Sequence, residues 1–277
     1  MILDRFRQSE RAASRSASGS AIANASTGRT ETPPSQVSPR YAVQGRTVTI
    51  PVEVRDAVAI VATFVVSAAA VRRLLPTPRL VVPELLPGRA LCALAAVEYR
   101  DNDLGCYNEL AVNFFVQVDG AHPTPLFGLL RGFHRREIGA YIHRLPVTTS
   151  FSRDAGRDIW GFPKTVEEIT FRDQGRWRTC TLVAGGVQVL TLSVIHGGRR
   201  RFPAAPQDAY AWRDGTLFKT SSVMRGEGVG FRLGGARLTL GAHAIADELR
   251  SLGLPRRALM TTSMEHMAAS FAAPVLL

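Results

Sequence analysis

Hydrophobic residues form their longest run at positions 57–71, interrupted only by two hydroxyl-bearing residues. A membrane-spanning helix needs about 20 apolar residues, and this run is shorter. Ser67 is a favourable helix N-cap, and a helix cannot continue through Pro76. The pattern therefore predicts a buried strand through Val66 and a helix from Ser67 that ends before Pro76.

Beyond Pro87 and Gly88, most of the chain has the alternation and composition of β-strands. The predicted strands are 90–98, 110–118, 166–171, 176–184, 187–195, 217–223 and 237–240. Gly185 and Gly186 indicate a hairpin turn, and residues 213–215 indicate another. Short helices are predicted at 152–160 and 244–252. Strands and helices do not alternate regularly, so we expect a β-rich α+β fold with antiparallel sheets curled or closed around an apolar interior and a few peripheral helices.

The first 40 residues differ in composition from the rest. They are rich in Ser, Ala, Thr and Arg and contain only three acidic residues. We interpret residues 1–40 as a disordered tail, although an Arg- and Ser-rich, acid-poor segment is also typical of an organelle transit peptide. Residues 41–277 contain enough apolar material for one large domain.

The net charge of +11 raises the question of an acidic partner. Apart from the run 199–201, the arginines are scattered, without the aromatic residues of a single-strand binder or a DNA-reading motif. We therefore expect no nucleic-acid and no membrane partner, and a solvated arginine-rich surface, with an anionic substrate as the lesser alternative. The three cysteines form neither a disulfide pattern nor a metal-ligand pattern, which favours a cytoplasmic protein. The six histidines form no zinc motif, so we expect no metal.

One glycine-rich segment, 226–230, superficially resembles a phosphate-binding loop. It lacks the strand–turn–helix context that gives such a loop its function. We interpret it as a flexible hairpin loop.

Lys164 is one of only two lysines among the 34 basic residues, the other being Lys219. An amine that must lose its proton and attack a carbonyl cannot be replaced by arginine. Trp160 and Phe162 are close in sequence, and desolvation by such rings would lower the pKa of the lysine. Lys164 is therefore a candidate Schiff-base nucleophile, although composition alone is equally consistent with chance survival of two lysines.

The second informative segment is 104–109, which ends in Glu109 at the start of an otherwise apolar strand. Taken alone, this carboxylate is more typical of a solvated strand end or of an ion pair with an arginine.

Together, residues 105–109 and the segment 156–164, with further similarity from about Tyr41 to the C-terminus, resemble the acetoacetate decarboxylase superfamily. The resemblance implies a β-barrel-like fold, a homo-oligomer, no cofactor and a Schiff base between Lys164 and a small keto acid or ketone. It aligns Glu109 with the active-site glutamate of the family, and Arg46 with an arginine that positions the substrate carboxylate. It also implies a pocket whose candidate residues are Phe162, Trp160, Tyr107, Thr165 and Leu94.

Two positions depart from this family. Typical decarboxylases carry a second, activating lysine where this chain has Thr165, and another acidic pocket position corresponds to Leu94, with Glu98 nearby. We therefore expect a lyase that decarboxylates a β-keto acid or performs aldol and dehydration chemistry through a lysine iminium. The alternative is a non-catalytic relative that binds a carbonyl metabolite or has a structural role.

Overall fold

The computed structural model describes residues 38–120 and 124–277. Almost all of the predicted N-terminal tail lies outside these residues. No helix within the described ranges is long and apolar enough to cross a membrane.

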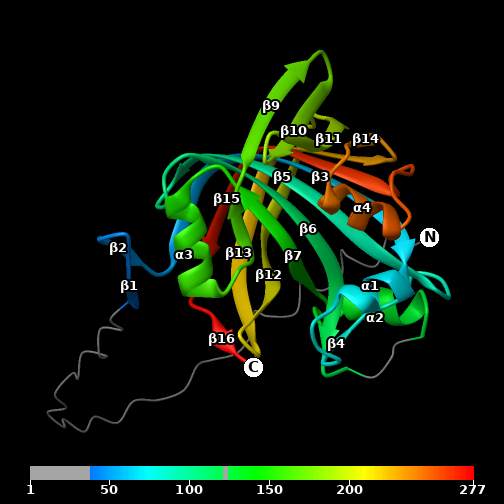
Figure 1. Cartoon of the computed structure of the whole chain (residues 1–277), viewed down its shortest axis with the longest axis horizontal. Coiled ribbons are helices and arrows are strands. Elements are labelled where there is room, and N and C mark those ends of the chain that lie inside the picture. Colours follow the sequence, from blue (N-terminus) through cyan, green and yellow to red (C-terminus); the bar gives the residue numbers. More distant parts are fainter. Residues whose placement is uncertain (1–37, 121–123) are drawn as a thin grey trace, which may run out of the picture. The chain divides into compact units, whose positions relative to one another are not determined.

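Seven strands close into a barrel in this part of the chain, in the order β6–β5–β3–β15–β13–β12–β7, with β7 pairing again with β6 (Figure 1). Their bounds are β3 (Val52–Ser67), β5 (Arg89–Asn102), β6 (Tyr107–Val118), β7 (Gly139–Val147), β12 (Arg200–Arg213), β13 (Thr216–Leu233) and β15 (Met260–Phe271). Neighbours are antiparallel except β7 and β12, which pair in parallel. The predicted β-rich α+β fold with a barrel-like core is confirmed, and its sheet is mixed rather than purely antiparallel.

A second, four-stranded sheet has the order β14–β11–β10–β9. Its strands are β9 (Glu168–Gln174), β10 (Trp177–Ala184), β11 (Val187–Ile195) and β14 (Ala236–Leu240). Gly185 and Gly186 connect β10 to β11 with φ of +56° and +77°, values that suit a tight hairpin turn. Figure 1 shows β9 and β10 extending past the end of the barrel strands.

The alternation of side chains on the barrel strands creates two hydrophobic cores. The outer core lies between the barrel wall and the four-stranded sheet, and it contains Leu94 with Phe114 and Leu190. The inner core lies inside the barrel and contains Val97 and Leu145. Because successive strand residues face opposite sides, Leu94 and Ala95 belong to different cores.

Four helices are present in the described ranges: α1 (Ala68–Leu74), α2 (Phe127–His134), α3 (Ser150–Trp160) and α4 (Ala244–Ser251). The Ser67 side chain caps α1 by accepting a hydrogen bond from the backbone N–H of Ala70, as the sequence predicted. Short strands complete the fold: β1 (Arg40–Val43), β2 (Arg46–Thr49), β4 (Leu80–Val81), β8 (Lys164–Val166) and β16 (Val275–Leu276).

The prediction of a hairpin loop at 226–230 was wrong, because this segment lies inside β13. Gly226 pairs with Met267 and Gly230 with Ser263 on β15. A Cβ atom at Gly228 would lie 2.7 Å from Cγ of Glu265, so the absent side chain allows the two strands to pass closely. The predicted strand 166–171 is also divided, since Val166 belongs to β8, Glu167 to neither strand, and residues 168–171 to β9.

Candidate active site

The turn after α3 delivers Lys164 to the barrel. Thr149 caps the start of α3 by accepting a hydrogen bond from the backbone N–H of Ser152. Gly161 ends the helix with φ of +69°, a left-handed conformation that favours glycine. Three residues later the chain enters β8, where Lys164 pairs with Leu145 of β7. The predicted short helix thus fixes where the lysine enters the barrel wall.

Gly156 makes room for the lysine side chain. A Cβ atom at this position would lie 2.5 Å from Cδ and 2.7 Å from Cε of Lys164. Real Cβ atoms do not approach other atoms this closely, so any larger residue would displace the lysine. The glycine that opens the motif 156–164 therefore has a steric function.

Lys164 and Glu109 form a buried ion pair. Nζ of Lys164 lies 2.9 Å from Oε2 of Glu109, and the two side chains are only 4% and 11% exposed. The same ammonium lies 5.0 Å from the centre of the Tyr107 ring, a distance at which a cation is attracted to the ring face. Glu109 reaches this position from β6, between Val97 of β5 and Val147 of β7. The structure thus brings together three of the residues predicted from separate segments.

Tyr99 completes this group and was not predicted. Its hydroxyl donates a hydrogen bond to Oε1 of Glu109, 3.2 Å away, and its ring stacks on Tyr107 with centroids 4.5 Å apart. Burial, with the neighbouring Glu109 charge, raises the pKa of Tyr99 well above its ordinary value, which keeps the phenol protonated as a donor. The feature that links Tyr99 to the predicted site is its position on β5, directly opposite Tyr107 of β6.

These groups border a mostly apolar cavity of about 170 Å³ inside the barrel. Four of the predicted site residues line it: Tyr107, Glu109, Trp160 and Phe162. Trp160 is fixed by a hydrogen bond from its indole Nε1 to the carbonyl oxygen of Ala272, at 2.9 Å. Lys164 is not among the lining residues, but its amine contacts two of them, Glu109 and Tyr107. A ligand in the cavity would therefore meet the carboxylate first.

Three other predicted site residues do not line this cavity. Leu94 is fully buried in the outer core, because strand alternation turns Ala95 inward instead. Thr165 follows Lys164 on β8 and is exposed. Arg46 is exposed on β2, with its guanidinium carbon 4.0 Å from the centre of the Phe151 ring.

Glu98, the nearby acidic alternative, does not reach the cavity either. Its carboxylate is 2.5 Å from Nη2 of Arg178 on β10. This pairing places Glu98 on the outside of the barrel, so Glu109 is the carboxylate of the cavity.

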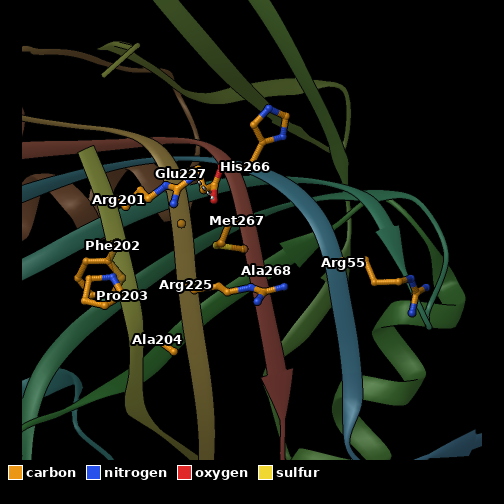
Figure 2. Close-up of a pocket in the computed structure, with 11 residues that line it drawn as sticks. Arg55, Arg201, Phe202, Pro203, Ala204, Arg225, Glu227, His266, Met267 and Ala268 are labelled. Carbon is orange, nitrogen blue, oxygen red and sulfur yellow. Dashed lines mark ion pairs between the residues drawn. The ribbon is translucent and has the colours of Figure 1, made fainter. Parts of the chain in front are cut away.

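A larger groove of about 630 Å³ lies on the outer face of β12, β13, β15 and β3 (Figure 2). Arg55, Arg201, Arg225 and His266 contribute basic groups to it, and Arg201 approaches Glu227 at 3.5 Å. Its lining shares one residue, Met267, with the lining of the inner cavity.

The inner site offers a primary amine, a carboxylate and a phenol in contact, in a place with little solvent. A lysine amine that transfers its proton to a neighbouring carboxylate can attack a carbonyl carbon, and the resulting acid can return the proton later. No cluster of three or more potential metal ligands occurs in the described part of the chain.

The sequence model of the acetoacetate decarboxylase (ADC) family matches residues 34–273. No curated protein matches the chain. A solved structure of an acetoacetate decarboxylase is similar, with 17% identity and a TM-score of 0.58, over 90% of this chain and 95% of that chain.

Two other solved structures are also similar. The acetoacetate decarboxylase of Legionella pneumophila has 15% identity and a TM-score of 0.60, over 82% of this chain and 87% of that chain. The enduracididine biosynthesis enzyme MppR, complexed with pyruvate, has 16% identity and a TM-score of 0.55, over 83% and 91%. Since the family match spans most of the sequence, this chain belongs to the acetoacetate decarboxylase family.

Proposed function

We propose that the protein is a lyase that forms a Schiff base between Lys164 and a small keto acid or ketone. The observation that carries this proposal is the 2.9 Å contact between Nζ of Lys164 and Oε2 of Glu109 beside the apolar cavity. Glu109 takes a proton from the ammonium, and the neutral amine attacks the carbonyl carbon. Loss of water then gives the iminium.

The iminium withdraws electrons from the adjacent carbon. With a β-keto acid, the bond to the carboxylate carbon breaks, CO₂ leaves, and its electron pair forms an enamine. Protonation of the enamine carbon and hydrolysis of the iminium release the ketone and the free lysine. Glu109 is the group placed to supply and recover these protons, and the hydrogen bond from Tyr99 orients its second oxygen.

Similar structures support carbonyl chemistry and leave the final step open between decarboxylation and aldol-type chemistry. MppR is described in complex with pyruvate and with the condensation product of pyruvate and imidazole 4-carboxaldehyde. An enamine on Lys164 could likewise add to an aldehyde instead of a proton. Arg46 would bind the substrate carboxylate only if its guanidinium group moved away from the ring of Phe151.

A non-catalytic role is the second candidate. It is favoured by one observation: Lys164 is held in an ion pair and does not itself line the cavity. In that case the pair would stabilise the barrel, and the cavity would bind a carbonyl metabolite without covalent chemistry.

Reductive trapping separates these two functions. We expect borohydride with acetoacetate or pyruvate to add one adduct per chain, detected by intact mass, with peptide mapping to Lys164. Lys219 is the internal control, because it is more exposed and pairs with Asp208 at 2.9 Å. Lys164→Arg should abolish the adduct. An adduct on Lys219, or on neither lysine with a broad keto-acid panel, would contradict the Schiff-base function.

A further inference from the structure

Asn113 is a half-buried polar residue of the cavity whose side-chain oxygen has no hydrogen-bond partner among residues 38–120 and 124–277. It lines the cavity from β6, yet its Oδ1 is buried and accepts no hydrogen bond, and its side chain makes none with any residue the structure describes. A buried acceptor without a partner is unfavourable by about 1–3 kcal/mol, so such an atom commonly binds water or a donor group of a ligand.

The other asparagine of the cavity has no such deficit. Nδ2 of Asn102 donates to the carbonyl oxygen of Gly105 at 2.6 Å, and its Oδ1 accepts from the backbone N–H of Leu104 at 2.8 Å. Asn102 is therefore satisfied by its own turn. Asn113 differs because its cross-strand neighbours, Ala93 and Ile142, are apolar side chains.

The register of the sheet places Asn113 far from the reactive amine. It lies four positions after Glu109 on the same strand and on the same face, a separation of about 13 Å. Between them, Ala111 pairs with Ala95, and both small side chains line the cavity. A β-bulge in the β6–β7 pairing falls next to Asn113, and bulges commonly redirect side chains near functional sites.

We infer that Asn113 determines specificity by binding a neutral polar group at the far end of the substrate. The substrate class is a carbonyl compound whose carbonyl carbon reaches Lys164, whose short apolar chain crosses Ala111 and Ala95, and whose other end carries a neutral hydrogen-bonding group. This inference rests on the proposed function for the position of the carbonyl. A cavity of about 170 Å³ holds a compact ligand, equivalent to about six water-sized groups.

The far group is neutral because no Lys or Arg of the described residues lines the cavity. A carboxylate bound only by an amide in an apolar environment would lose most of its hydration without a compensating charge. A neutral donor such as a hydroxyl needs only the single hydrogen bond that Oδ1 of Asn113 can accept.

The test compares two ketones of equal length, 6-hydroxyhexan-2-one and heptan-2-one, by their rates of borohydride trapping. In the Asn113→Leu variant, which keeps the size but loses the accepting oxygen, the rate ratio of hydroxy ketone to alkyl ketone should fall about tenfold. Leu94→Met, a volume-conserving change in the outer core, is the control and should leave the ratio unchanged. If Asn113→Leu does not fold, Asn113→Ala, which removes the same oxygen without adding bulk, is used with the same expectation for the hydroxy ketone.

Equilibrium binding of the corresponding alcohols, hexane-1,5-diol and heptan-2-ol, gives a second measurement by ligand-detected NMR. These alcohols cannot form a Schiff base, so their binding ratio reports on Asn113 even if trapping fails. A tenfold fall of this ratio without any trapped adduct would support the inference and reject the proposed function. A ratio that changes less than twofold in folded Asn113 variants would overturn the inference, whether or not Lys164 is trapped.

Discussion

The inner cavity and the outer groove share Met267, but they differ in size and in the burial of their charged groups. The groove is larger, about 630 Å³ against 170 Å³, and it carries three arginines. Arg201 is 82% exposed, and Arg55 pairs with Asp101 and Asp103. The described lining of the cavity contains no lysine or arginine, and the cation that contacts this lining, Lys164, is almost completely buried.

This difference illustrates how burial changes what a charged group depends on. Exposed ion pairs are hydrated and contribute about 0–1 kcal/mol. A buried pair has lost its hydration, so each partner depends on the other and on the groups around it. The arginines of the groove account for part of the net charge of +11, whereas the cavity contains the candidate chemistry.

The largest effect is expected from removing one charge of the buried pair. Glu109→Gln leaves the Lys164 ammonium without a counter-charge inside the barrel and should lower the free energy of unfolding by about 3–5 kcal/mol. Urea unfolding measures this change, and Schiff-base trapping should fall as well.

A double variant separates the charge effect from packing. Glu109→Gln combined with Lys164→Met removes both charges and should recover most of the lost stability, because an apolar pair of similar volume is often neutral. If the double variant is as unstable as the sum of the two single variants, the pair is not coupled in the way its geometry indicates.

A smaller effect on stability, with a large effect on chemistry, is expected for Gly156→Ala. The new methyl group would overlap Cδ and Cε of Lys164, and overpacking of this kind costs about 1–3 kcal/mol, partly offset by the better helix propensity of alanine. Displacement of the amine should slow borohydride trapping more than tenfold. Arg157→Ala, an exposed position on the same helix, is the control. Equal trapping rates for Gly156→Ala and Arg157→Ala would contradict this prediction, because they would show that displacement of the Lys164 amine does not slow the reaction.

Much of the barrel could be predicted from local patterns, because alternation and turn residues act over short distances. The Ser67 cap and the Gly185–Gly186 turn are local signals of this kind, and both were confirmed. Strand pairing across the chain is not local. The glycines at 226–230 were interpreted as a loop because nothing in the segment reveals that β15 passes close to it.

The candidate site shows the same limit. Lys164, Glu109 and Tyr107 could be chosen from sequence and are in contact in the structure. Leu94 could not be assigned to a face of the sheet, because a one-residue change of register moves every side chain to the opposite side. Tyr99 was missed because its importance depends on a hydrogen bond to Glu109. Asn113 was missed because its importance depends on a side-chain oxygen that has no partner among the described residues. The expected homo-oligomer stays a prediction.

The smallest effect is expected in the outer groove. Arg225 lies on β13 opposite Ala268 of β15, and Figure 2 shows its side chain extending across that strand. No ion pair of Arg225 occurs among residues 38–120 and 124–277. Arg225→Ala should therefore change the free energy of unfolding by no more than about 0.5 kcal/mol, as for most surface substitutions, and leave Lys164 trapping unchanged. A trapping rate that falls severalfold in this variant would mean that the groove communicates with the cavity through the shared Met267, and that its arginines belong to the function of the inner site.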